Sequence, residues 1–119
     1  MTLDKQLYIF KAKVLRVIDG DTLVIDLDMG FETHTIKRVR LLGVDTPERG
    51  QVNYNEAKAF TTQTVLGKDV YVQTYKADAF GRYLADVWYQ EGENEYRLSH
   101  ELTVRGLVKE SSKWNEEDE

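Results

Sequence analysis

The chain has 119 residues, enough for one domain with a single hydrophobic core. It contains no cysteine, which excludes disulfides, thiolate metal sites and cysteine nucleophiles. The formal net charge is −5, but residues 116–119 are all acidic, and without them 16 basic residues stand against 17 acidic ones. This balance argues against high non-specific affinity for nucleic acid.

The first part of the chain predicts a meander of three strands. Alternating apolar residues indicate a strand over residues 7–18, and Asp-Gly-Asp-Thr at 19–22 indicates a tight turn. A second strand is expected over 23–27. After a turn at 29–31, a third strand is expected over 33–44.

The apolar spacing then changes to a helical period. It predicts a helix over residues 53–66, with Gly67 as its C-terminal stop. Asn53 and Glu56 can serve as a capping pair at its start, because an amide three residues before a glutamate resembles a capping box.

Strand alternation returns over residues 70–75 and 83–89, and a short second helix is expected over 98–105. Five strands with a helix between the third and fourth predict an α+β fold that is mainly β, a five-stranded OB-type barrel with two helices. Such barrels favour nucleic-acid and sugar ligands. We expect residues 1–110 to form this domain and residues 111–119 to form a frayed acidic tail.

The segment from Arg40 to Glu48 places an arginine, two carboxylates and the only proline of the chain within nine residues. Pro47 fixes its own backbone angle and pushes Thr46 toward an extended conformation, so this corner should be rigid. Two carboxylates beside a strand end indicate a hard metal ion, and an arginine next to them indicates a phosphate. The corner therefore favours phosphodiester chemistry.

Three charged blocks follow one another along the chain: Val-Ile-Asp-Gly-Asp-Thr at 17–22, the corner at 40–48, and Asp-Ala-Phe-Gly-Arg-Tyr-Leu at 78–84. Together with Glu-Ala-Lys-Ala-Phe at 56–60, they resemble the staphylococcal nuclease (thermonuclease) family. The resemblance implies a calcium-dependent endonuclease that hydrolyses DNA and RNA with little sequence specificity and leaves 3′-phosphates. It implies single-stranded nucleic acid as the preferred partner.

The resemblance also implies a metal site and a general base. Asp21 and Asp45 would be calcium ligands, and the backbone carbonyl of Thr46 would complete the protein contribution. Glu48 would orient or deprotonate the attacking water. Physical chemistry agrees, because Ca²⁺ prefers several oxygen ligands, and a glutamate within reach of a water can remove its proton.

Arg40 and Arg82 would grip the phosphate that is being cleaved. An arginine fork matches two phosphate oxygens and can strengthen its contact as charge develops on them. Aromatic stacking tolerates any base, which suits a nuclease without sequence preference. The aromatic residues expected to meet a base are Phe80, Tyr83 and Trp114.

Other interpretations exist for the same residues. Taken alone, Asp19 and Asp21 would simply stabilise a hairpin turn, and within the full set we keep that interpretation for Asp19 only. The alternative function is a non-catalytic OB-type module that binds nucleic acid or protein. It is motivated by the acidic balance and by Ala79, which stands where the family often has a lysine.

The end regions give expectations about assembly and location. Only 13 residues follow Gly106, so we expect the family's third C-terminal helix to be missing or vestigial, and the protein to be a monomer or a weak homodimer. No signal peptide and no membrane span is visible. The protein would be cytoplasmic if the chain is full length, and secreted if it is a processed form.

Overall fold

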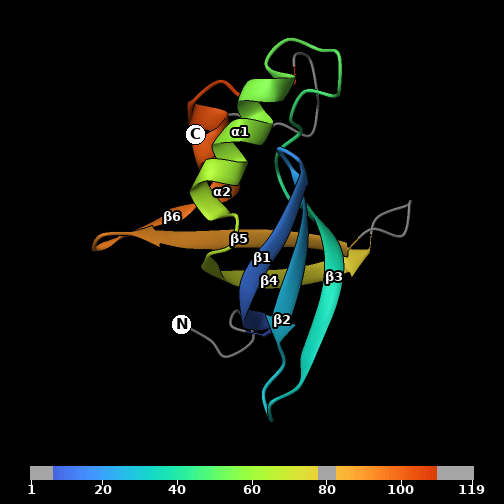
Figure 1. The fold of residues 1–119 in the computed structure, drawn as a ribbon, viewed down its shortest axis with the longest axis vertical. Coiled ribbons are helices and arrows are strands. Elements are labelled where there is room, and N and C mark those ends of the chain that lie inside the picture. Colours follow the sequence, from blue (N-terminus) through green and yellow to red (C-terminus); the bar gives the residue numbers. More distant parts are fainter. Residues whose placement is uncertain (1–6, 78–82, 110–119) are drawn as a thin grey trace.

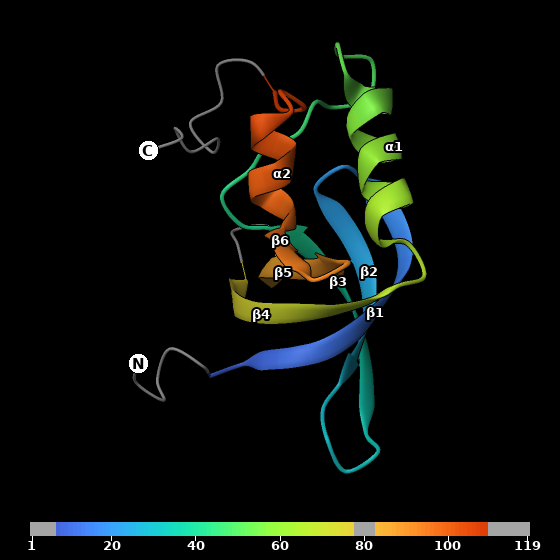
Figure 2. The same ribbon diagram turned by 90° about the vertical axis from the view of Figure 1, so that its left-hand side faces the viewer.

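The protein is a small barrel of strands with two helices at one end (Figures 1 and 2). The computed structural model describes residues 7–77 and 83–109. In this part of the chain the strands are β1 (Ile9–Asp19), β2 (Thr22–Asp28), β3 (His34–Leu41), β4 (Asp69–Ala77), β5 (Tyr83–Glu91) and β6 (Asn94–Arg97), and the helices are α1 (Tyr54–Val65) and α2 (Leu98–Val104).

The strands form one sheet that closes on itself. Their order is β3-β2-β1-β4-β5-β6, with antiparallel neighbours throughout. A parallel pairing of β3 with β5 closes the first five strands into a barrel, and α1 lies between β3 and β4 in the chain. The predicted five-stranded OB-type barrel of mainly β, α+β class is therefore confirmed. The four-residue β6, which pairs with the end of β5, is an element that the sequence did not predict.

The inward faces of the strands form a single core. β-Branched and leucine side chains dominate it, as is usual for the buried face of a pleated sheet. Leu98 and Leu102 of α2 are fully buried, and Ala57 and Val65 of α1 join the same cluster, so both helices cover this end of the barrel. The strand residues with no exposed surface are Val14, Leu23, Ile25, Leu41, Val72, Ala85 and Val87.

Helix α1 rests on the turn between β1 and β2, beside which it lies in Figure 1. The hydroxyl of Thr61 donates to the Gly20 carbonyl at 2.8 Å, and the hydroxyl of Tyr54 donates to Asp19 Oδ1 at 2.9 Å. Asp19 thus connects the turn to α1 through its side chain. The helix fixes the turn that carries the next residue of interest, Asp21.

The predicted capping pair at the start of α1 is wrong. Asn53 does occupy the N-cap position, but it adopts a left-handed conformation with φ of 69° and makes no side-chain capping hydrogen bond. Asparagine tolerates this conformation better than most residues, so the position selects it for backbone shape.

Two predicted features lie outside the described residues. These are the acidic tail at 111–119 and residues 78–82 of the charged block at 78–84. No helix in the described ranges is long and apolar enough to cross a membrane.

Candidate functional site

The predicted corner is built where β3 meets the first hairpin turn. Arg40 lies opposite Thr22 in the β2–β3 register, so the end of β3 runs beside the turn at Gly20 and Asp21. The Leu41 amide donates to the Asp21 carbonyl at 2.8 Å, which fixes the two segments together. Residues separated by about twenty positions in the chain therefore meet at one point.

Arg40 joins the two predicted metal ligands. Its Nη2 lies 3.0 Å from Asp45 Oδ1 and 3.3 Å from Asp21 Oδ2, while Nη1 donates to the carbonyls of Leu41 and Val44 at 2.9 Å each. The side chains of Arg40, Asp21 and Asp45 are only 7%, 9% and 18% exposed. Both carboxylates therefore converge on one cationic group in a largely buried place, where unpaired charge is costly.

Asp21 is held on both carboxylate oxygens. Thr22 Oγ1 donates to Oδ1 at 3.1 Å, and the backbone amide of Thr46 donates to Oδ2 at 3.0 Å. These bonds fix the carboxylate relative to the strand that follows and to the loop before Pro47. The first hairpin thus also holds the corner in place, in addition to the constraint predicted from the proline.

The donor set suits a hard cation. Two carboxylates directed at one point, next to further backbone oxygens, match the all-oxygen coordination of Ca²⁺, whereas zinc sites in proteins mostly include histidine or cysteine ligands. Among the described residues, no cluster of three or more His, Cys, Asp or Glu side chains could hold a metal ion. A metal here would therefore rely on Asp21, Asp45, backbone oxygen and water.

Glu48 lies at the open side of the corner. Its side chain is 71% exposed, and Oε2 lies 3.2 Å from Nζ of Lys109. The backbone amide of Lys109 also donates to the Asp45 carbonyl at 2.7 Å. Sequence reasoning missed Lys109, because no local pattern signals a contact between residues 61 positions apart.

A cavity of about 480 Å³ adjoins this side of the corner. The loop after Glu48 and the segment around Lys109 form its walls, so it lies next to the exposed carboxylate. Its lining residues are Pro47, Gly50, Gln51, Val52, Asn53, Val108 and Lys109.

The remaining predicted site residues are not brought to the corner in the described part of the chain. Arg82, Phe80 and Trp114 lie outside the described residues. Tyr83 begins β5 and pairs with a β3 residue next to Arg40, but its ring lies 5.2 Å from Nζ of Lys37. The roles of these four residues stay predictions.

Gly20 is required for close packing at the corner. Its φ is not positive, so the turn does not need glycine for backbone shape. A Cβ at this position would lie 3.0 Å from Ala57 Cβ and 3.1 Å from both Cγ2 and Oγ1 of Thr46. The Thr46 hydroxyl is buried and has no hydrogen-bond partner among the described residues. The approach of Gly20 to Thr46 is therefore a packing contact.

Gly20→Ala is expected to lower the free energy of unfolding by about 1–3 kcal/mol, the usual cost of overpacking. The gain of about 0.4–1 kcal/mol from a stiffer unfolded chain is too small to offset this cost. Urea denaturation of both proteins measures the difference. In an Ala57→Gly background the same substitution should cost less, because the nearest atom is gone, and an equal cost in both backgrounds would contradict the steric explanation.

The fold and the corner define a class of protein: a small OB-type barrel with an acidic, arginine-bridged site at its helix-covered end. Residues 38–119 match the family model described as staphylococcal nuclease homologue. The chain belongs to the staphylococcal nuclease family.

Several curated proteins are similar to this chain. A thermonuclease of Staphylococcus hyicus is 39% identical over 84 residues, which cover 64% of this chain and 47% of that protein. A thermonuclease of Staphylococcus intermedius is 38% identical over 100 residues, covering 77% and 56%, respectively. A micrococcal nuclease of Shigella flexneri is 34% identical over 79 residues, covering 66% and 42%. The chain thus spans about half the length of the curated relatives it matches.

Proposed function

We propose that the protein is a calcium-dependent nuclease that hydrolyses phosphodiester bonds of DNA and RNA, preferably single-stranded, and leaves 3′-phosphates. The observation that carries the proposal is the convergence of Asp21 and Asp45 on one buried position, with Glu48 exposed beside it. The relatives named thermonuclease and micrococcal nuclease support the same reaction class.

Asp21, Asp45 and the backbone carbonyl of Thr46 would hold the calcium ion. The two carboxylates already lie within 3.3 Å of a shared cationic group, so their charges are directed at one place. When bound, Ca²⁺ supplies Lewis-acid polarisation of the phosphate and offsets its negative charge.

Glu48 is the proposed general base. Its carboxylate reaches solvent, so it can accept a proton from a water that attacks phosphorus. Lys109 contacts the same carboxylate through Nζ and donates its backbone amide to the Asp45 carbonyl. It is therefore the proposed positioning residue for Glu48 relative to the aspartates.

Arg40 has two proposed roles. It aligns the aspartates through Nη2, and it is the arginine nearest to a phosphate bound against them. A buried guanidinium held by four contacts is preorganised, so it stabilises developing charge without having to reorient. Arg82 is the proposed second phosphate contact.

Digestion of single-stranded DNA by the purified protein tests the proposal. Cleavage is expected with calcium and not with chelator, and the products should carry 3′-phosphates. Asp45→Asn should abolish the calcium-dependent reaction, because it removes one of the two converging charges. Asp69→Asn is the matched control, since Asp69 lies at the exposed start of β4 and, within the described ranges, makes no hydrogen bond or ion pair with the corner residues. Binding without cleavage at high protein concentration would instead establish the non-catalytic module.

A further inference from the structure

Two exposed arginines lie on the outer face of the barrel, next to the corner on that face. Arg16 of β1 and Arg38 of β3 are both in register with Val24 of the intervening β2. Two positions along these strands toward the hairpin turn, past the inward-facing pair of Leu23 with Val39, Thr22 is in register with Arg40. Residues in register share a face of the sheet, and alternate residues of one strand do too. Arg16, Val24 and Arg38, here called the arginine row, therefore lie on the same face as Arg40.

The charges of the arginine row are not compensated within the protein. Among the described residues, neither Arg16 nor Arg38 makes an ion pair, and both side chains are exposed on either side of the half-buried Val24. Asp26 follows Val24 on the same face, but it contacts Nδ1 of His34 at 3.2 Å. Two guanidinium groups are thus left facing solvent beside the candidate site.

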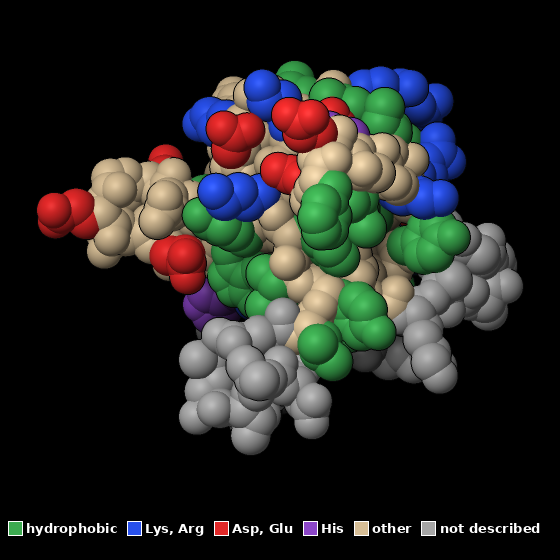
Figure 3. All heavy atoms as spheres, turned by 90° about the horizontal axis from the view of Figure 1, so that it is seen from below, with side chains coloured by type: hydrophobic (Ala, Val, Ile, Leu, Met, Phe, Trp, Pro, Cys, Tyr) green, Lys and Arg blue, Asp and Glu red, His purple; other side chains and the backbone are tan. Residues whose placement is uncertain are grey.

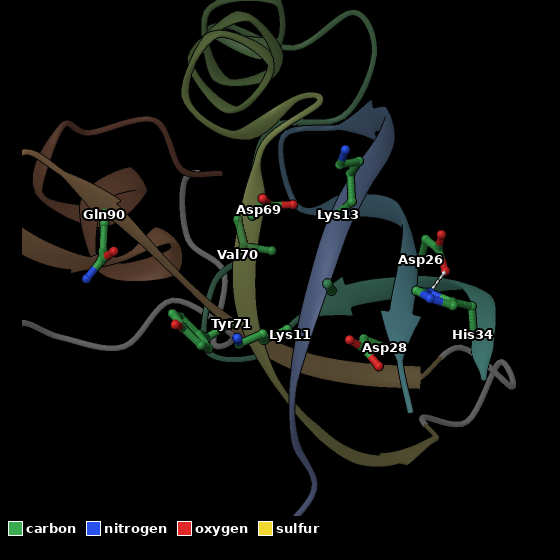
Figure 4. Close-up of a pocket in the computed structure, with 10 residues that line it drawn as sticks. Lys11, Lys13, Asp26, Asp28, His34, Asp69, Val70, Tyr71 and Gln90 are labelled. Carbon is green, nitrogen blue, oxygen red and sulfur yellow. Dashed lines mark hydrogen bonds and ion pairs between the residues drawn. The ribbon is translucent and has the colours of Figure 1, made fainter. Parts of the chain in front are cut away.

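The lysines farther along the same face have acidic neighbours, unlike the arginine row. Lys13 lies between Asp26 and Asp69 in the register of β1 with its two neighbours. Together with Lys11 and Asp28 these residues line a second cavity, also of about 480 Å³ and distinct from the one beside Glu48. Figure 4 shows its lysine and aspartate side chains interspersed. Acidic neighbours thus offset the positive charge there, which is not so at the arginine row.

The surface view agrees with an uneven distribution of charge. Seen from below, one group of Lys and Arg side chains lies at the upper right of Figure 3, on the side of the molecule where β3 lies, and another lies at the upper left. Asp and Glu side chains lie toward the centre and the left of that view. On this lower face the side of β3 therefore carries mainly Lys and Arg among its charged side chains, although the net charge of the chain is −5.

We propose that the arginine row binds the backbone phosphates of a polynucleotide strand that continues outward from the corner. The proposal rests on the proposed nuclease function and extends it, because it assigns a strand of several nucleotides, rather than a single nucleotide, as the substrate. Arg38 lies about 7 Å from Arg40 along β3, and the Cα atoms of Arg16 and Arg38 lie about 10 Å apart across two strand spacings. Arginine side chains reach neighbouring phosphates over such distances and grip them bidentately.

Contacts of this kind carry no sequence information. They position a strand through its phosphates, and they make binding depend on salt. The two arginines would also offset the acidic net charge of the protein at the place where the negatively charged strand binds.

Two double variants test the arginine row. Arg16→Gln with Arg38→Gln removes it, and Lys11→Gln with Lys13→Gln removes the same total charge from the same face as the matched control. Cleavage of an oligonucleotide of about a dozen nucleotides is compared with cleavage of a dinucleotide across a salt series, since phosphate contacts set the salt slope. Equal urea midpoints confirm that all three proteins fold alike.

The arginine variant is expected to raise KM for the oligonucleotide at least tenfold at low salt and to leave the dinucleotide unchanged. The slope of log KM against log salt should flatten by about 1.4, which is about 0.7 for each lost phosphate contact on a single strand. The lysine variant should leave both substrates and the slope near wild-type values. Equal effects of the two variants, or no effect of the arginine variant, would overturn the proposal.

The failure of the nuclease proposal would be recognised separately. In that case wild-type protein cleaves neither substrate. Fluorescence anisotropy of the labelled oligonucleotide in calcium then measures how strongly the wild-type protein and both variants bind it, without any turnover. Weaker binding with a flatter salt slope in the arginine variant alone would still support the phosphate contacts, and unchanged binding would overturn them.

Discussion

Arg40→Met is expected to lower the free energy of unfolding by about 3–5 kcal/mol, the usual cost of removing one partner from a buried ion pair. The guanidinium is the cation that Asp21 and Asp45 share, and it also donates hydrogen bonds to the Leu41 and Val44 carbonyls. Without it two largely buried carboxylates face each other uncompensated. Urea denaturation near neutral pH in chelator measures the loss and excludes any contribution from bound metal.

Two further variants separate charge from geometry at this position. Arg40→Lys keeps the positive charge, but a single ammonium group cannot contact both carboxylates and both carbonyls at once. It should therefore be more stable than Arg40→Met and less stable than the wild-type protein. Adding Asp21→Asn and Asp45→Asn to Arg40→Met should also recover part of it, because the orphaned charges are then gone. A loss below about 1 kcal/mol in Arg40→Met would mean that the pair is worth no more than an exposed one.

Glu48→Gln is expected to lower kcat for DNA cleavage by about 10²–10⁴, the range that a positioned general base contributes. KM should stay near its wild-type value, because the amide keeps the shape of the side chain and removes only its basicity. Stability should change by no more than about 0.5 kcal/mol, since the side chain is 71% exposed. Steady-state kinetics in saturating calcium, with the urea midpoint beside them, provide the measurement.

The matched control for Glu48 is Glu56→Gln. Glu56 is an exposed glutamate in the first turn of α1, and no contact joins it to the corner among the described residues. It should leave kcat unchanged. A loss of less than tenfold in Glu48→Gln, or a rise in KM with kcat intact, would assign Glu48 to substrate binding instead of proton transfer.

Local patterns predicted much of the fold. The alternation in the first hairpin and the helical period after Pro47 are both short-range signals, and the elements lie within a few residues of their predicted bounds. β6 was missed because its four residues, Asn94–Arg97, are mostly polar and too short to show a period. The cap of α1 was predicted wrongly because Asn53 serves as a left-handed residue and not as a hydrogen-bond acceptor.

The candidate site was predictable in its members more than in their arrangement. Asp21, Asp45 and Glu48 were marked by sequence, and the structure brings Asp21 and Asp45 together through Arg40. The depth of that guanidinium, with four internal contacts, depends on the path of the loop after β3 and could not be read from the chain. Lys109 was missed for the same reason, since only tertiary structure brings it to Glu48.

The bond between the Lys109 amide and the Asp45 carbonyl has a consequence for biosynthesis. Chains emerge from the ribosome with the N-terminus first. The first hairpin and β3 can therefore assemble while α2 is still being translated, but the corner lacks its last contacts until residue 109 has emerged. A nascent chain thus carries the aspartates early and completes the surroundings of Glu48 only when all of the described sequence is outside the ribosomal tunnel.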